Sequence, residues 1–137
     1  MFRLPFLGWH LRRSGHLPVD RKSPRSALHS FELAAQRVRA GSSMVFFPEG
    51  TRSRDGRMGE FKHGAALLAI KAGVPLVPVA ICGTREVLKP DSLVVHPGKV
   101  QLVVGQPLST EGLTHRDTGR LTEMARERIA EARKDRS

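Results

Sequence analysis

The chain has 137 residues, 39% of them hydrophobic, and its formal net charge at pH 7 is +10. This length gives room for one domain with a core, and the sequence has no apolar run of about 18 residues that could cross a bilayer. The single cysteine, Cys82, excludes an internal disulfide.

The positive charge favours an anionic partner, which would be nucleic acid, an anionic membrane surface or a phosphate-bearing substrate. Nucleic-acid binding requires a recognisable module, or basic residues interleaved with exposed aromatics, and the sequence has neither. Many arginines lie instead near the two ends, around 12–13 and along 116–136. We therefore expect no nucleic-acid partner and keep a small basic nucleic-acid-binding protein only as a remote alternative.

The N-terminal segment, residues 5–13, predicts a short helix that stops near Gly15. Its bulky apolar residues, Trp9 among them, are flanked by arginines. Such a helix could lie on a membrane surface, or it could pack on the core with its basic side in water. Both interpretations stay open.

Residues 23–41 predict an amphipathic helix, with Ser23 as N-cap, Pro24 as the first helical residue and Gly41 after the end. Residues 16–19 before it are too short for periodicity to assign. Residues 44–47 after it form an apolar run that predicts a short buried strand. The order strand, helix, strand indicates a right-handed crossover.

An acid, a glycine, a hydroxyl and a guanidinium follow this expected strand within 49–52. Gly50 allows a sharp bend or a close approach to a ligand. Arg52 offers a planar fork of donors that suits phosphate or carboxylate. Open α/β sheets usually bind ligands at the carboxyl ends of their strands. This stretch is therefore the first candidate for a binding site.

The rest of the chain alternates loops with apolar segments. Residues 54–59 predict a charged, glycine-rich loop, and Lys62 and His63 stand near the start of the next expected helix, where an anion would be favoured. The predicted elements are a buried helix over 65–72 stopped by Gly73, strands over 76–81 and 100–104, and a terminal amphipathic helix around 121–132, whose charged residues, with Arg133, are expected in solvent. The predicted fold class is α/β, a single domain with a mostly parallel or mixed central sheet and helices on both faces.

Three stretches resemble successive sequence blocks of the glycerolipid acyltransferase family, which includes 1-acylglycerol-3-phosphate acyltransferases. Residues 47–53, Phe-Pro-Glu-Gly-Thr-Arg-Ser, resemble the third block and carry the most specific match. Residues 15–21 resemble the second block, and residues 77–81 resemble the fourth. The similarity runs from about Pro5 to about Leu108.

The family's first block, His-x4-Asp, is absent, because none of the chain's 6 histidines has an aspartate five residues later. The catalytic histidine and aspartate are therefore not assigned to any residue of this chain, and His63 is a poor replacement for the base. We expect residues 1–137 to be a partial acyltransferase domain, with the missing block encoded upstream of Met1. A sheet without its early strand would expose an apolar edge and reduce solubility.

The resemblance implies transfer of a fatty acyl group from acyl-CoA or acyl-carrier protein to a lysophosphatidate hydroxyl in phospholipid biosynthesis. It implies no cofactor and no metal, and a peripheral location at the cytoplasmic side of a membrane with anionic lipid. An inactive homologue that binds lipid phosphate or a partner remains an alternative. The implied binding residues are Arg21 and Arg52 for phosphate, Gly50 and Thr51 as donors, Glu49 to hold the arginines, and Val77 and Pro78 to line or support the acyl groove.

Overall fold

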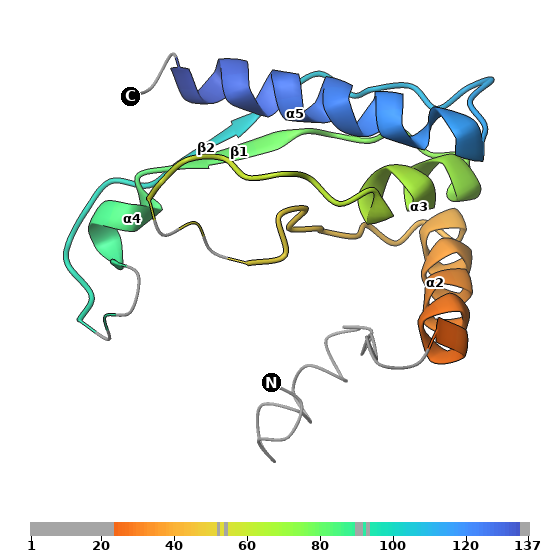
Figure 1. Ribbon diagram of the computed structural model, residues 1–137, viewed down its shortest axis with the longest axis horizontal. Helices are drawn as coiled ribbons and strands as arrows, with labels where there is room; N and C mark the ends of the chain where they lie inside the picture. Colours follow the sequence, from red (N-terminus) through yellow and green to blue (C-terminus); the bar gives the residue numbers. More distant parts are fainter. Residues whose placement is uncertain (1–23, 52, 54, 90–91, 93, 135–137) are drawn as a thin grey trace. The chain divides into compact units, whose positions relative to one another are not determined.

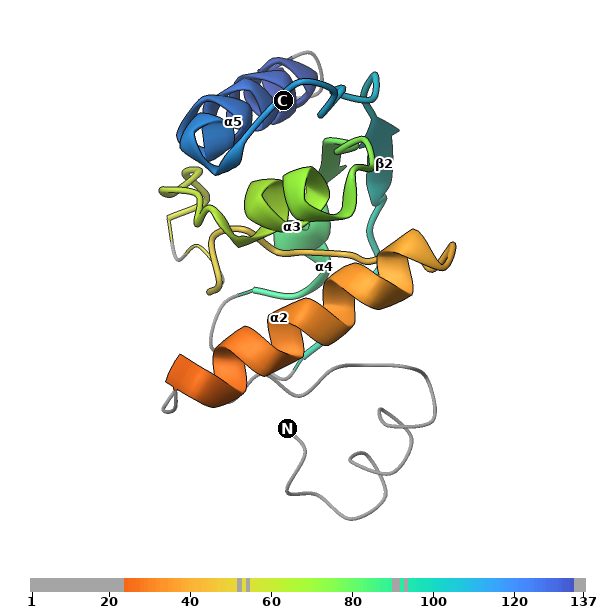
Figure 2. The same cartoon turned by 90° about the vertical axis from the view of Figure 1, so that its right-hand side faces the viewer.

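The computed structural model describes residues 24–51, 53, 55–89, 92 and 94–134. The expected helix at 5–13, the segment 16–19 and two site residues, Arg21 and Arg52, lie outside this part. The chain divides into two compact units, 1–43 and 44–137. The elements in chain order are α2 (Pro24–Arg39), α3 (Gly64–Ala72), β1 (Val79–Cys82), α4 (Thr84–Val87), β2 (Gln101–Val104), a 3-10 turn (His115–Asp117) and α5 (Thr118–Lys134). Figure 1 labels the helices and strands, and Figure 2 gives a second view.

Helix α2 is the regular element described in the first unit. It begins at Pro24, as predicted, because proline has a fixed φ suited to a first helical residue and needs no partner for an N–H there. It ends at Arg39, and Gly41 follows with a φ of +93°. Ala34 and Ala35 are buried, which confirms the predicted amphipathic pattern.

The core of the second unit lies between α3, α5 and β1, and α5 packs against both of the others (Figure 1). Helix α3 ends at Gly73, whose left-handed φ of +69° confirms the predicted glycine stop. Leu121 on α5 is fully buried. The buried cluster comprises Ala66, Leu108, Leu121 and Ala125, with Ile70, Leu76 and Leu113 packed around it.

Strands β1 and β2 form an antiparallel pair in which Val79 lies opposite Val104 and Ile81 lies opposite Leu102. The first strand begins only after Pro78, because proline has no N–H to donate to a ladder. One face of this pair is covered, since Ala80 is 2% exposed. The opposite face is uncovered. Its four paired residues are 39–68% exposed: Val79, Ile81, Leu102 and Val104.

The α/β fold class is confirmed by this combination of helices with a small sheet. The predicted strand at 44–47 was wrong: no ladder forms there, and Val45 and Phe47 are 81% and 74% exposed. An apolar run indicates which residues can be buried, but a strand also needs a neighbouring strand to satisfy its backbone groups. None of the described residues supplies that neighbour, and the one described strand pair is antiparallel.

Over the described ranges, no helix combines the length and the apolar composition needed to cross a membrane.

Candidate functional site

The candidate site is built on a tight turn at 47–50. The Gly50 N–H donates to the Phe47 carbonyl at 3.1 Å, which closes the turn. Gly50 has a φ of +74°, a left-handed conformation that favours glycine over any residue with a Cβ. The bend predicted from the sequence is therefore present at the predicted residue.

The segment 59–62 is attached to this turn at two points. The Gly59 N–H donates to Glu49 Oε2 at 3.0 Å. The Lys62 N–H donates to the Pro48 carbonyl at 2.9 Å. The Glu49 carboxylate thus stabilises a backbone approach, a contact that sequence spacing did not indicate.

Lys62 also lies beside Gly50 through its side chain. A Cβ built at Gly50 would stand 3.0 Å from Lys62 Nζ. The ammonium therefore occupies space that a side chain at position 50 would need. This contact could not be predicted from the sequence, because the two residues are twelve positions apart.

The loop after the turn is held by side chains from both near and far in the sequence. Asp55 Oδ1 accepts from the Ser53 hydroxyl and from the Arg57 N–H, both at 3.0 Å. The Arg57 N–H and then the Ser53 hydroxyl lower the pKa of Asp55 from its ordinary value of 3.8. These bonds favour the ionised carboxylate in the folded loop.

Arg133 on α5 donates from Nη2 to the Gly56 carbonyl at 2.9 Å in a partly buried contact. The expectation that this arginine lies simply in solvent was therefore wrong. Helical periodicity places Arg133 on the polar side of α5 but cannot show that a loop 77 residues away in sequence lies there.

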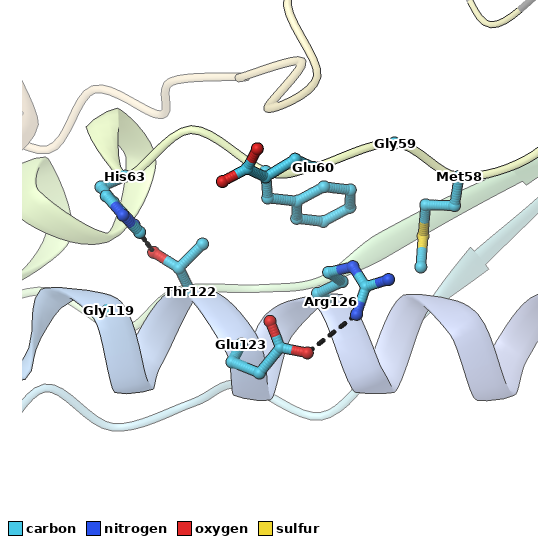
Figure 3. Close-up of a pocket in the computed structure, with 9 residues that line it drawn as sticks. Met58, Gly59, Glu60, His63, Gly119, Thr122, Glu123 and Arg126 are labelled. Carbon is cyan, nitrogen blue, oxygen red and sulfur yellow. Dashed lines mark hydrogen bonds and ion pairs between the residues drawn. The ribbon is translucent and has the colours of Figure 1, made fainter.

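An open pocket of about 310 Å³ lies between residues 58–63 and α5 (Figure 3). Buried Phe61 is one of its lining residues, and Arg126 pairs with Glu123 at 2.8 Å on its α5 side. Gly59 belongs to this lining and also to the Glu49 contact. The pocket and the turn at 47–50 therefore share one supporting segment.

His63 lies at the opposite end of the pocket from Met58, with its Nδ1 atom 3.1 Å from Thr122 Oγ1 (Figure 3). The Thr122 hydroxyl donates its proton to the Thr118 carbonyl at 2.8 Å, so it can only accept from the ring. The hydrogen-bond network thus assigns the Nδ1–H form to a neutral His63. This partner is a hydroxyl and not a carboxylate, so the described geometry gives His63 no aspartate of the His-x4-Asp kind.

The structure describes five of the predicted site residues, and three of these are consecutive, at and directly after the turn. Glu49, Gly50 and Thr51 lie on the turn, and Thr51 is exposed. Pro78 is buried, and its carbonyl accepts from the Gly105 N–H at 2.8 Å, which is a structural role. Val77 beside it is 43% exposed.

Comparisons with known proteins agree on one family. A family model described as Acyltransferase matches residues 1–82. The chain is 38% identical over 109 residues to a chloroplastic 1-acyl-sn-glycerol-3-phosphate acyltransferase of Brassica napus, covering 79% of this chain and 32% of that protein. It is 33% identical over 131 residues to the Pseudomonas aeruginosa enzyme of the same name, covering 93% of this chain and 50% of that protein.

The crystal structure of the 1-acyl-sn-glycerophosphate acyltransferase PlsC from Thermotoga maritima is similar, with a TM-score of 0.74 and 27% identity. The match covers 96% of this chain and 53% of PlsC. The chain thus spans between about a third and about a half of the proteins it matches. The resemblance inferred from the three sequence blocks is confirmed: the chain belongs to the acyltransferase family.

Proposed function

We propose that this chain carries the acceptor-phosphate half of a 1-acyl-sn-glycerol-3-phosphate acyltransferase. The carrying observation is the turn at 47–50, in which the Phe-Pro-Glu-Gly-Thr sequence of the third block bends at Gly50 with Glu49 fixed on Gly59. Two relatives and the similar crystal structure bear the name of this activity.

The reaction joins an acyl thioester, from acyl-CoA or acyl-carrier protein, to the free hydroxyl of lysophosphatidate. The hydroxyl oxygen bonds to the thioester carbonyl carbon, the carbon–sulfur bond breaks, and the hydroxyl proton passes through a base to the released thiol. Neither a cofactor nor a metal enters this balance. The base is expected from a His-x4-Asp block, which is absent from the 137 residues.

The proposed role of this chain is to bind and orient the acceptor. Arg21 and Arg52 neutralise the phosphate, since a guanidinium can make paired charge-assisted hydrogen bonds to its oxygens. The N–H of Gly50, expected from the sequence to be a donor to the phosphate, instead closes the turn on the Phe47 carbonyl, so Gly50 provides the bend and room for a close approach. Exposed Thr51 supplies a hydroxyl donor. Glu49 holds the turn through its bond to Gly59, exposed Val77 lines the acyl groove, and buried Pro78 supports that groove.

A net charge of +10 supports a peripheral position on an anionic membrane surface, at the cytoplasmic side, where the lipid substrate is present. The absence of a His-x4-Asp pattern also supports a second candidate, an inactive homologue that binds lipid phosphate. Both candidates use the same phosphate site.

Substitution tests the shared site. We expect Arg52→Ala and Arg21→Ala each to weaken lysophosphatidate binding about tenfold or more, because a charge-assisted hydrogen bond contributes roughly 1.5–3 kcal/mol. Arg128→Ala is the control, since Arg128 is 60% exposed and pairs with Glu131 on the same helix. Calorimetric titration with a short-chain lysophosphatidate below its micelle concentration measures the three affinities. Equal affinities would place the phosphate elsewhere.

A further inference from the structure

The ammonium of Lys62 lies close to Gly50, on the side where another residue would carry its side chain. Its Nζ, Cε and Cδ atoms stand 3.0, 3.4 and 3.7 Å from the point where a Cβ at Gly50 would be. The side chain therefore runs along the open side of the glycine rather than away from it.

The backbone fixes this placement. The Lys62 N–H is bonded to the Pro48 carbonyl, and Gly59, three residues earlier, is bonded to the Glu49 carboxylate. Two attachments on one short segment keep the lysine's Cα next to the turn. The flexible part is only the four-carbon stem, which ends at the glycine.

The Lys62 ammonium has no ion pair or hydrogen bond to any other described residue. Glu49, the nearest acid in sequence on the turn, uses Oε2 to accept from Gly59. A lysine ammonium carries three donors and binds phosphate as a point charge. Its donors are therefore available to a ligand.

We propose that Lys62 is a direct ligand of a phosphate monoester seated against Gly50, and that this group is the phosphate of the lysophosphatidate acceptor. The assignment rests on the proposed function, to which it adds a third cationic residue in addition to Arg21 and Arg52. Gly50 serves the same contact, because its missing side chain lets the ammonium and the phosphate approach the backbone.

The same chemistry is offered by the 3′-phosphate of a CoA donor, so the experiment uses both sources. Calorimetric titrations of the 137-residue chain would use short-chain lysophosphatidate, CoA and dephospho-CoA, which lacks the 3′-phosphate. Lys62→Met removes the charge but keeps an unbranched stem, and Lys62→Arg keeps the charge. Lys99→Met is the matched control, because Lys99 is also exposed and unpaired among the described residues.

We expect Lys62→Met to weaken lysophosphatidate binding about ten- to a hundredfold, as for other charge-assisted contacts. We expect Lys62→Arg to retain most of the affinity and Lys99→Met to match the native chain. Gly50→Ala should also weaken binding, because a Cβ would displace the ammonium. Far-UV circular dichroism of each variant checks that the fold is kept, and Lys62→Gln repeats the test should the Met variant misfold.

The outcomes separate the two proposals. If Arg52→Ala weakens binding and Lys62→Met does not, or if Lys99→Met weakens it equally, the lysine assignment is overturned and the proposed function stands. If Lys62→Met affects CoA but not dephospho-CoA or lysophosphatidate, the phosphate belongs to the donor and the acceptor assignment is wrong. If the native chain binds no lysophosphatidate, both proposals fail.

Discussion

Gly50 is needed both for its left-handed backbone and for the space that Lys62 occupies, and only the first could be predicted from the sequence. Its left-handed φ of +74° could be expected from a glycine between an apolar run and a polar cluster. The closeness of Lys62 could not, because it depends on how residues 59–62 return to the turn. The local bend of the candidate site was thus predictable from the sequence, whereas the approach of Lys62 appeared only in three dimensions.

Asp117 is the residue whose ionisation the structure ties most directly to a helix start. Its carboxylate accepts from the Thr114 N–H at 2.9 Å and from the Thr114 hydroxyl at 3.0 Å. These two bonds, in that order, and then Arg120 lower the pKa of Asp117 from 3.8. The folded-state pKa therefore lies below the unfolded one.

The sign of the pH dependence follows from this lowered pKa. Asp117 contributes stability that is fully present above its ordinary, unfolded-state pKa of 3.8 and is lost as pH falls through the lower folded-state pKa. We expect Asp117→Asn to remove this part of the acid sensitivity. Thermal melts of both proteins between pH 2 and 6 (a range of roughly two units around that pKa) measure it. The assignment would be contradicted if the two proteins differed in melting temperature by the same amount at every pH.

Helix α5 is central to the packing of the second unit, because it contacts both α3 and β1 and supplies the fully buried Leu121. Leu121→Ala should destabilise the fold by about 2–5 kcal/mol, since it removes apolar contacts and leaves a cavity. Met124→Ala is the control on the same helix, because Met124 is 41% exposed. Urea unfolding followed by circular dichroism compares the two.

A loss of stability in Leu121→Ala no larger than in Met124→Ala would show that the core does not close around α5.

This helix was among the best predicted elements, because its apolar residues recur at helical spacing over 121–132. The strand at 44–47 was mispredicted because its pattern is local whereas its pairing is not. The antiparallel partner of β1 likewise depends on a return of the chain that no periodicity encodes.

At the scale of the whole chain, we expect the acceptor to bind without being acylated. The 137 residues contain a phosphate-binding candidate but no His-x4-Asp pattern. Loss of a general base lowers a rate about 10²–10⁴-fold. We therefore expect lysophosphatidate binding with little or no thioester consumption.

Release of free thiol from acyl-CoA, with and without lysophosphatidate, measures that consumption. His63→Ala is the informative variant, since His63 is the described histidine bonded at the pocket, through Thr122. Robust turnover in the native chain that disappears in this variant would make His63 the base and overturn the assignment of the base to an absent block.

The net charge of +10 leads to a prediction about membranes. We expect the chain to sediment with vesicles that contain anionic lipid, not with neutral ones, and to be released as salt rises, because charges on a surface are screened beyond about 10 Å at 0.1 M salt. Trp9 is the one tryptophan in the sequence, so its emission reports on residues 5–13. A blue shift on anionic vesicles would place that segment at the lipid interface, since its apolar residues would leave water there. Binding without any blue shift would mean that the arginines, and not Trp9, make the contact; co-sedimentation with neutral vesicles at high salt would contradict the electrostatic account altogether.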